Sequence, residues 1–479
     1  MKKSFLFYVI CLFAWMKVHA QERPNVLFIA VDDLNDWVGC LKGHPQAKTP
    51  NIDKLAANGI LFTNAQCQAP ICGPSRASVM TGLLPTTTGN YLQLDDVDIK
   101  KANDITKNAI FLPDYFEQYG YKTMGTGKLF HLGDKAKVFD EYRKDTADLY
   151  GPIPSKRFKY DPLWFGKPKG TGTDWGAFPS EDKDMPDVRS AEWAAEKLMM
   201  QHDKPFFLAV GFVRPHVPWY VPQKWFDRFP VNDIQTPPYL KTDMDDVPLM
   251  GQRVADLPPM PTTEWMIQTN QWKDAVQAYL ACVNFADAQV GKVLDALEKS
   301  KYVKNTIVVL WSDHGYHLGE KNRFGKQALW QRATKSVLVF KVPSGKSNEI
   351  CSQPVQLVDM YPTLTALCGL PANKMNEGHS LMPLLNHPAS AKWPYYAVTS
   401  YGKGNVSVHS SRYHFIQYED KSMELYDFIN DPNEWKNIAA DKKYKGIITK
   451  MLKQVPAIQA DLAPDSKYGV NEYFKSLNQ

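Results

Sequence analysis

Residues 72–82 form the most chemically specific pattern in the chain. The run reads Cys-Gly-Pro-Ser-Arg-Ala-Ser-Val-Met-Thr-Gly. Pro74 suits the first turn of a helix, where its missing N–H costs nothing. A residue at the start of such a helix faces free backbone N–H groups and the positive end of the helix dipole, which favour an anion. The pattern predicts that Cys72 lies at an anion-binding helix start. A buried structural cysteine is the plain alternative.

Acidic side chains follow two apolar segments elsewhere in the chain. Asp32 and Asp33 directly follow one apolar run, and Asp313 with His314 closely follows another. Adjacent carboxylates repel, and a loop at a strand end seldom bears that cost without a cation. A solvated turn is the alternative for the Asp-Asp pair alone. Two acidic loops after two buried strands are what a divalent-metal site in an α/β fold requires.

Three continuous apolar runs rich in β-branched residues predict buried parallel strands. They are residues 26–31, 206–210 and 307–311. Helical patterns lie between them: Thr49 and Pro50 mark a helix start, and residues 275–297 carry a long amphipathic pattern. This alternation predicts an α/β fold, with a large, mostly parallel sheet covered by helices on both faces.

Two segments, residues 137–190 and 228–262, are rich in Pro, Asp, Lys and aromatic residues and show little periodicity. We expect them to be long loops over the strand ends, where the substrate pockets of α/β folds lie. Past residues 378–385 the pattern changes to short strands. These are expected at 414–418 and 424–427, side by side in a small sheet, and a final helix is expected over 444–455.

Residues 1–20 have the features of a secretory signal peptide. Lys2 and Lys3 form its charged start, residues 5–15 are apolar, and a small residue, Ala20, ends a cleavage site. The apolar stretch is too short to anchor the chain, and no later segment has 18 consecutive apolar residues. The sequence predicts an exported, periplasmic or secreted protein without stable membrane insertion. The predicted division of the chain is 1–20, 21–385 and 386–479.

The composition excludes several classes of protein. The 479 residues are 44% hydrophobic and 22% charged, as in ordinary globular proteins. The net charge of +5 is spread along the chain rather than gathered in basic blocks, which argues against nucleic-acid binding. Seven cysteines are too few for a disulfide scaffold. One bridge, such as Cys351 to Cys368, is compatible with the sequence, but spacing does not establish it.

The run at residues 72–82 resembles the modification signal of type I sulfatases almost letter for letter. The resemblance implies an alkaline-phosphatase-like core and a smaller C-terminal α+β subdomain. It also implies that a maturase oxidises Cys72 to formylglycine (3-oxoalanine), whose hydrate is the nucleophile. Arg76 would hold that hydrate in place. By the same resemblance, calcium is bound by the modified residue 72 together with Asp32, Asp33, Asp313 and His314.

The Asp313-His314 pair narrows the resemblance to one branch of the family. Most sulfatases have Asn at the second position, whereas this version is similar to the iduronate-2-sulfatase branch. Further segments similar to that branch are Gly127 to His131, Pro205 to Gly211, Arg214 to Pro218, and Gly315 to Lys326. Because imidazole also suits softer metals, His314 leaves the identity of the metal open.

The reaction of a sulfatase assigns roles to the remaining matched residues. A sulfate ester is an anion, so Lys128, Lys326 and the metal are expected to surround its oxygens. His216, with Lys326, is the predicted general acid for the leaving sugar oxygen. His131 is the predicted base that removes a proton from the sulfated hydrate, so that sulfate leaves and the aldehyde is regenerated.

The leading hypothesis is an exported sulfatase that removes the 2-O-sulfate of a uronic acid from a glycosaminoglycan or algal oligosaccharide. Candidate substrate-binding residues in its loops are Tyr91, Gln93, Arg214, Trp219, Tyr220 and Arg323. Action on xylose-2-sulfate or hexosamine-6-sulfate stays open. Two competing hypotheses are a formylglycine-dependent phosphodiester or phosphonate hydrolase and a glycan-binding protein that has lost catalysis.

Overall fold

The computed structural model describes residues 23–131, 137–144, 149–163, 170–467, 469 and 471–476. The predicted signal peptide, residues 1–20, lies outside the described residues. Within them, no helix is both long enough and apolar enough to cross a membrane.

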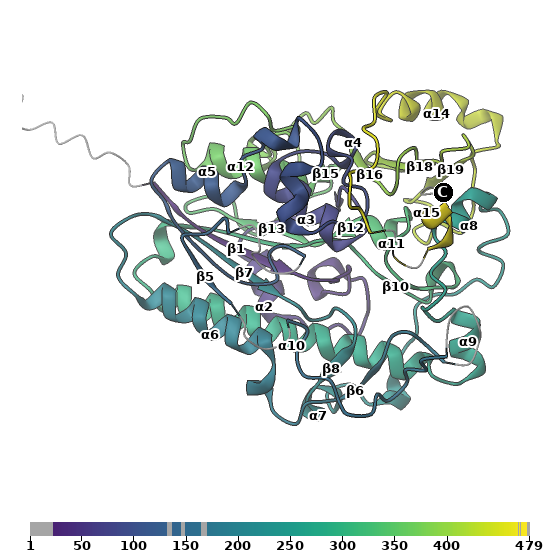
Figure 1. Ribbon diagram of the computed structural model, residues 1–479, viewed down its shortest axis with the longest axis horizontal. Helices are drawn as coiled ribbons and strands as arrows, with labels where there is room; N and C mark the ends of the chain where they lie inside the picture. The colour runs from purple at the N-terminus through teal and green to yellow at the C-terminus, as the bar shows by residue number, and fades with distance from the viewer. Residues whose placement is uncertain are drawn as a thin grey trace, which may run out of the picture.

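An eight-stranded sheet has the strand order β14-β2-β13-β9-β1-β7-β4-β5. It lies at the centre of the molecule, where Figure 1 labels its strands β13, β1, β7 and β5. The five strands from β9 to β5 are parallel, whereas β13 runs antiparallel to both of its neighbours. The strands are β1 (Asn25–Val31), β2 (Ile60–Phe62), β4 (Lys122–Gly127), β5 (Glu141–Arg143), β7 (Phe206–Phe212), β9 (Thr306–Ser312), β13 (Leu338–Lys341) and β14 (Glu349–Cys351). The predicted α/β fold and its three buried strands are confirmed.

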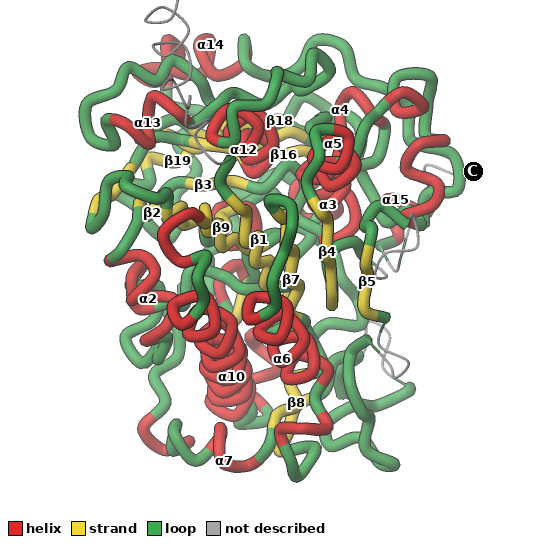
Figure 2. Tube along the Cα trace, turned by 90° about the vertical axis from the view of Figure 1, so that its left-hand side faces the viewer, coloured by secondary structure: helices red, strands yellow, loops and turns green. Residues whose placement is uncertain are grey.

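Helices cover both faces of this sheet (Figure 2). One layer contains α2 (Pro50–Ala57), α6 (Pro186–Met199) and α10 (Trp272–Lys299), and the other contains α3 (Cys72–Thr81), α5 (Leu112–Gln118) and α12 (Met360–Leu367). Alternate side chains of β1 pack against the two helical layers, because successive side chains of a strand point to opposite faces of the sheet. Leu27, Ile29 and Val31 pack with the first layer.

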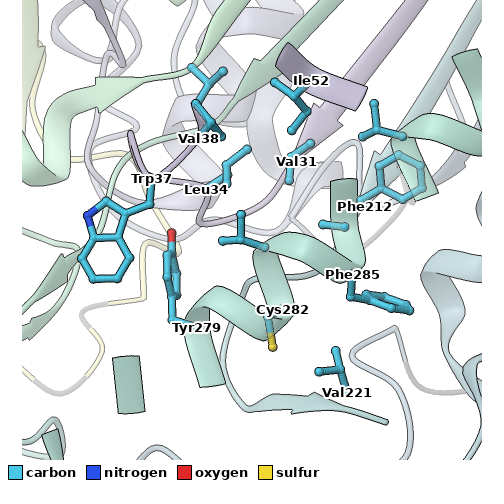
Figure 3. Packing of buried hydrophobic residues seen from close by; sticks show 14 of the residues in the cluster. Val31, Leu34, Trp37, Val38, Ile52, Phe212, Val221, Tyr279, Cys282 and Phe285 are labelled. Carbon is cyan, nitrogen blue, oxygen red and sulfur yellow. The ribbon is translucent and has the colours of Figure 1, made fainter. Parts of the chain in front are cut away.

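The long helix predicted over 275–297 is confirmed as part of α10, and it contributes much of the first layer. Tyr279 and Phe285 of α10 belong to the same buried cluster as Val31 and Leu34 (Figure 3). Side chains in this cluster are almost completely removed from water. Burial of their apolar area therefore stabilises the carboxyl end of β1, which Asp32 directly follows.

The start of α2 is as predicted, but its cap is not. Thr49 occupies the N-cap position, but its hydroxyl accepts from Gly39 N rather than from a helix N–H, and it donates to the Asp53 side chain. The free N–H groups of Asn51 and Ile52 donate to the carboxylate of Asp287, which comes from α10. One helix therefore caps another, which sequence spacing alone does not reveal.

A second, smaller sheet follows the core. Its four antiparallel strands are β16 (Ala397–Ser400), β17 (Val406–His409), β18 (Tyr413–Gln417) and β19 (Met423–Asp427). The predicted neighbouring strands at 414–418 and 424–427 correspond to the last two. The predicted helix corresponds to α14 (Lys445–Leu452), but it is not final, because α15 (Glu472–Ser476) follows. The domain boundary at 385 stays a prediction.

The two segments expected to be loops are only partly so. Strands β5 and β6 (Trp175–Ala177) and the start of α6 lie in the first segment, and α8 (Leu249–Val254) lies in the second. The remaining elements are β3 (Ala65–Gln66), β8 (Trp219–Val221), β10 (His317–Leu318), β11 (Phe324–Gly325), β12 (Lys335–Ser336), β15 (Val355–Gln356), α4 (Pro85–Thr88), α7 (Gln223–Phe226), α9 (Thr263–Gln268), α11 (Gln331–Thr334) and α13 (Met382–Asn386). Cys351 and Cys368 are free thiols, so the suggested disulfide is not formed.

Candidate active site

The two acidic loops meet at the carboxyl ends of β1 and β9, which are neighbouring parallel strands of the central sheet. In the parallel register of β1 and β9, Val31 pairs with Ser312, so the residues that follow each strand emerge side by side. The backbone N–H of Asp33 donates to Asp313 Oδ1 at 3.1 Å. Asp33 has φ of 56°, a left-handed conformation that turns the chain sharply after Asp32. The strand ends thus bring together carboxylates that are 280 residues apart in sequence.

Cys72 lies in the first turn of α3, as the proline pattern predicted. Ile71 occupies the cap position and Cys72 is the first helical residue. The Cys72 Sγ atom is 3.2 Å from Lys326 Nζ, 3.4 Å from His314 Nε2 and 3.9 Å from Asp33 Oδ1. Although burial and Asp32 act against it, the ammonium groups of Lys128 and Lys326 lower the pKa of this thiol.

Arg76 joins the two acidic loops from one helical turn further along α3. Its Nε donates to Asp313 Oδ2 at 2.9 Å, and its Nη2 donates to Asp32 Oδ1 at 3.2 Å. All three side chains are completely buried. A planar guanidinium with several donors can hold two carboxylates at once, which a lysine could not do in the same geometry.

Two lysines supply further positive charge. Lys128, which follows β4, pairs with Asp32, and Lys326, which follows β11, pairs with Asp33. Burial by itself would lower the pKa of each lysine, but the adjacent carboxylates raise it. Both ammonium groups are therefore charged, and Lys326 Nζ lies 3.2 Å from Cys72 Sγ, so an anion at this position would be stabilised.

The predicted acid, His216, approaches this centre, and the charges of Lys128 and Asp32 act on the predicted base, His131. His216 Nε2 is 3.9 Å from Asp33 Oδ2, and its Nδ1 contacts the carbonyl of Val217. Burial, with the charges of Lys326 and Lys128, holds the pKa of His216 well below its ordinary value. Burial and Lys128 lower the pKa of His131 to about 4. Both imidazoles are thus neutral at pH 7.

The donor atoms of this centre fit a divalent cation. Asp32, Cys72, Asp313 and His314 offer atoms within 4.8 Å of one another, and Asp32, Asp33, Cys72 and His216 form a second such group. Asp33 Oδ2 is buried and has no hydrogen-bond partner among the described residues. Burial, opposed in part by Lys326, raises the pKa of Asp33 to about 6. A cation would satisfy that oxygen and the carboxylates around it.

Tyr150 also contacts this centre, although no sequence pattern singles it out. Its hydroxyl accepts from Lys128 Nζ at 3.2 Å, and its ring centroid is 4.9 Å from that of His216. It comes from the segment 137–190, which the sequence assigned to loops over the strand ends. Recognition of this residue requires the tertiary structure.

Four of the predicted substrate-binding side chains belong to the framework instead. Tyr91, Trp219, Tyr220 and Arg214 are at most 1% exposed, so they have no surface to offer a saccharide. The Tyr91 hydroxyl donates to the carbonyl of Ala460. The guanidinium of Arg214 donates to backbone carbonyls of Tyr150, His216 and Tyr220. Aromatic and basic residue types suggested binding, but burial assigns them to support.

Gln93 and Arg323 lie closer to the candidate site. The side-chain oxygen of Gln93 accepts from Gly73 N at 3.1 Å, directly beside Cys72. Arg323 donates to the carbonyl of Lys326 at 2.6 Å and lines a cavity of about 250 Å³ with Thr262. Gln93 therefore fixes the first turn of α3, which carries the thiol, and Arg323 fixes the turn that carries Lys326.

Two family descriptions match this chain. The model described as "Sulfatase" covers residues 24–370, and the one described as "N-sulphoglucosamine sulphohydrolase, C-terminal" covers residues 319–461. The first spans every predicted catalytic and metal-binding residue. The second spans the small antiparallel sheet.

Among curated proteins, the chain is 48% identical to a sulfatase of Formosa agariphila over 95% of this chain and 90% of the relative. It is 31% identical to iduronate 2-sulfatase of Homo sapiens over 73% of this chain and 70% of the relative. Among solved structures, a phosphonate monoester hydrolase of Agrobacterium radiobacter has a TM-score of 0.70 at 20% identity, over 90% of this chain and 95% of that one. That last likeness shows the shared fold alone.

Proposed function

Because this chain belongs to the sulfatase family and is a sulfuric ester hydrolase, we propose that it removes the 2-O-sulfate of a uronic acid from a sulfated oligosaccharide. The sugar would come from a glycosaminoglycan or an algal polysaccharide. The observation that carries the chemistry is the positive charge around Cys72. Lys326 Nζ is 3.2 Å from the Cys72 sulfur and pairs with Asp33, and Lys128 pairs with the neighbouring Asp32.

Each nearby side chain has a task in this reaction. The ammonium groups of Lys128 and Lys326 bind the sulfate oxygens and stabilise the charge that grows on them. Arg76 keeps Asp32 and Asp313 in place behind the reacting group. His216 gives a proton to the leaving sugar oxygen, and the negative charge of the bound sulfate raises its pKa for that task. His131 accepts a proton when sulfate is released.

Two groups complete this proposed site. Cys72, once oxidised to formylglycine by a maturase, supplies a hydrated aldehyde as nucleophile. A bound divalent cation such as calcium would supply further positive charge to this site. The residues that would hold the cation are Asp32, Asp33, Asp313, His314 and residue 72. Because His314 is a nitrogen donor, other divalent cations are tested beside calcium.

Specificity for the 2-O-sulfate of a uronic acid is supported by sequence similarity. The chain is 31% identical to a human protein named iduronate 2-sulfatase. The Asp313-His314 pair is similar to that branch as well. The position of the sulfate, at O2, and the identity of the sugar, a uronic acid, are therefore proposed together.

We also propose that the protein is exported to the periplasm or secreted. The support is the signal-like segment 1–20, with its charged start, short apolar stretch and small residues before Gln21. Expression of the whole chain in a bacterium should give a mature N-terminus at Gln21, read by mass spectrometry. An intact Met1 on the exported protein, or retention in the cytoplasm, would contradict the proposal.

The test of function is release of inorganic sulfate from defined saccharides. The panel contains uronate-2-sulfate, hexosamine-6-sulfate and xylose-2-sulfate fragments, and the control is Cys72→Ala, which cannot form the aldehyde. Mass spectrometry first establishes that residue 72 is formylglycine. We expect release from the 2-O-sulfated uronate by the wild-type protein alone.

The remaining outcomes distinguish the competing hypotheses. Release only from the hexosamine or the xylose keeps the sulfatase and rejects the uronate. Faster turnover of an aryl phosphodiester than of the matched aryl sulfate favours phosphoryl chemistry. Binding of saccharide without turnover, in protein with unmodified Cys72, favours a glycan-binding role.

A further inference from the structure

Tyr150 lies between two of the groups that the proposed reaction needs. Its hydroxyl is 3.2 Å from Lys128 Nζ, and the same ammonium group lies 4.9 Å from the centre of its ring. On the other side, its ring and the imidazole of His216 are 4.9 Å apart between centroids. The phenol is only half-buried, whereas Lys128 is completely buried. One tyrosine thus contacts a sulfate-binding cation and the proton donor.

The backbone is arranged to keep this contact fixed. Arg214 donates to the carbonyl of Tyr150 at 2.9 Å and to the carbonyl of His216 at 3.2 Å, so one guanidinium joins the two segments. The carboxylate of Asp187 in turn accepts from the N–H groups of Val213 and Arg214 at 2.7 and 2.9 Å. A buried charged network of this kind holds its members in one geometry.

We propose that Tyr150 is a positioning residue of this sulfatase: its ring orients the imidazole of His216 toward the leaving oxygen, and its hydroxyl orients Lys128. This inference rests on the proposed role of His216 as proton donor. The two contacts are separable, because the ring acts on the histidine and the hydroxyl acts on the lysine. Loss of a group that orients a proton donor should slow the reaction most for those leaving groups that most need a proton.

Two substitutions therefore have different expected signatures. Tyr150→Phe keeps the ring and removes the hydroxyl, so it weakens sulfate binding whatever the leaving group is. Tyr150→Leu removes the ring as well, so His216 loses its orientation. Only the second substitution should make the rate more sensitive to the leaving group.

The experiment measures kcat/KM on a series of aryl sulfates whose leaving groups range from 4-nitrophenol to unsubstituted phenol. Tyr150→Phe should lower all rates alike, by roughly 10-fold, the effect of one hydrogen bond to a charged group. Tyr150→Leu should lower the rate on phenyl sulfate by about 100-fold, the order expected for a misplaced proton donor. On 4-nitrophenyl sulfate it should resemble Tyr150→Phe.

Tyr302→Phe is the matched control, because its half-buried hydroxyl donates to the carbonyl of Met200, away from the site. Formylglycine content and thermal unfolding are measured for every variant. Equal losses along the whole series in Tyr150→Leu, or no loss at all, overturn the proposal. The role of Tyr150 is tested on aryl sulfates, whereas the uronate specificity is tested on the panel of saccharides. Failure of one proposal is therefore distinguishable from failure of the other.

Discussion

The two aspartates after β1 are compensated differently, and the difference indicates where a cation belongs. Asp32 is paired with Arg76 and Lys128, and these charges, outweighing the effect of burial, hold its pKa well below the usual range. Asp33 is paired with Lys326 through Oδ1, but its buried Oδ2 lacks a hydrogen-bond partner among the described residues. Because Asp33 belongs to one of the two groups of potential metal ligands, the unsatisfied oxygen is a candidate ligand atom.

A metal-binding prediction follows from that oxygen. After removal of metal with a chelator, adding calcium at about 100 times its Kd should stabilise the wild-type protein by about 2.7 kcal/mol. Asp33→Asn should gain much less at the same concentration, because it loses a charged ligand. Thermal unfolding measures both, with magnesium, manganese and zinc compared in parallel.

Asp98→Asn provides the control for this prediction, since Asp98 forms an ion pair with Lys101 and is not among the candidate ligands. It should respond to calcium as the wild type does. Equal stabilisation of wild type and Asp33→Asn by calcium would show that Asp33 is not a ligand. Greater thermal stabilisation by zinc than by calcium would show that the site prefers a softer metal, as the imidazole of His314 allows.

At the scale of elements, one helix of the first layer completes the start of another. Asp287 on α10 accepts from the N–H groups of Asn51 and Ile52 at 3.1 and 2.8 Å. It also accepts from the side-chain amide of Asn51 at 2.8 Å. This contact joins the start of α2 to α10.

Removal of this cap should destabilise the fold without altering the chemistry. Asp287→Ala leaves buried donors unpaired and should lower the free energy of unfolding by about 2 kcal/mol. Asp287→Asn should cost less, because its amide oxygen still accepts one bond. Urea unfolding gives both values, and Asp295→Ala on the exposed face of the same helix is the control. A wild-type midpoint for Asp287→Ala would refute the cap.

At the scale of the whole molecule, one buried lysine joins three distant segments. Lys321 Nζ pairs with Asp243 Oδ1 at 2.6 Å and also donates to the carbonyl of Glu434. The side chains of the pair are only 2% and 3% exposed. The pair therefore links a connecting segment of the core, the turn before β11, and the segment that follows the small sheet.

Breaking the pair from one side should be more harmful than removing it altogether. Lys321→Met leaves the Asp243 carboxylate buried without its positively charged partner, which should destabilise the protein by about 3–5 kcal/mol. The double variant Lys321→Met with Asp243→Leu should recover most of that loss. Thermal unfolding tests this, with Lys304→Met as an exposed control. If the double variant is no more stable than the single one, the charge of Asp243 is not the cause.

Local sequence patterns were enough to predict the fold class and the family, and they brought forward the candidate reacting groups. The continuous apolar runs indicated buried parallel strands, and the run at 72–82 is specific at many positions at once. Pro74 marks a helix start, and the acidic pairs mark the ends of strands, whatever the rest of the chain does. These signals were readable because they depend on neighbours in the chain.

Contacts between distant segments determine which residues support the site and which face it. Tyr91, Trp219, Tyr220 and Arg214 have the residue types of a sugar-binding surface, yet packing buries them. Tyr150 has no local signal, and only the meeting of its loop with Lys128 and His216 reveals it. Burial and partner choice arise when segments far apart in sequence pack together, and no local pattern encodes those contacts.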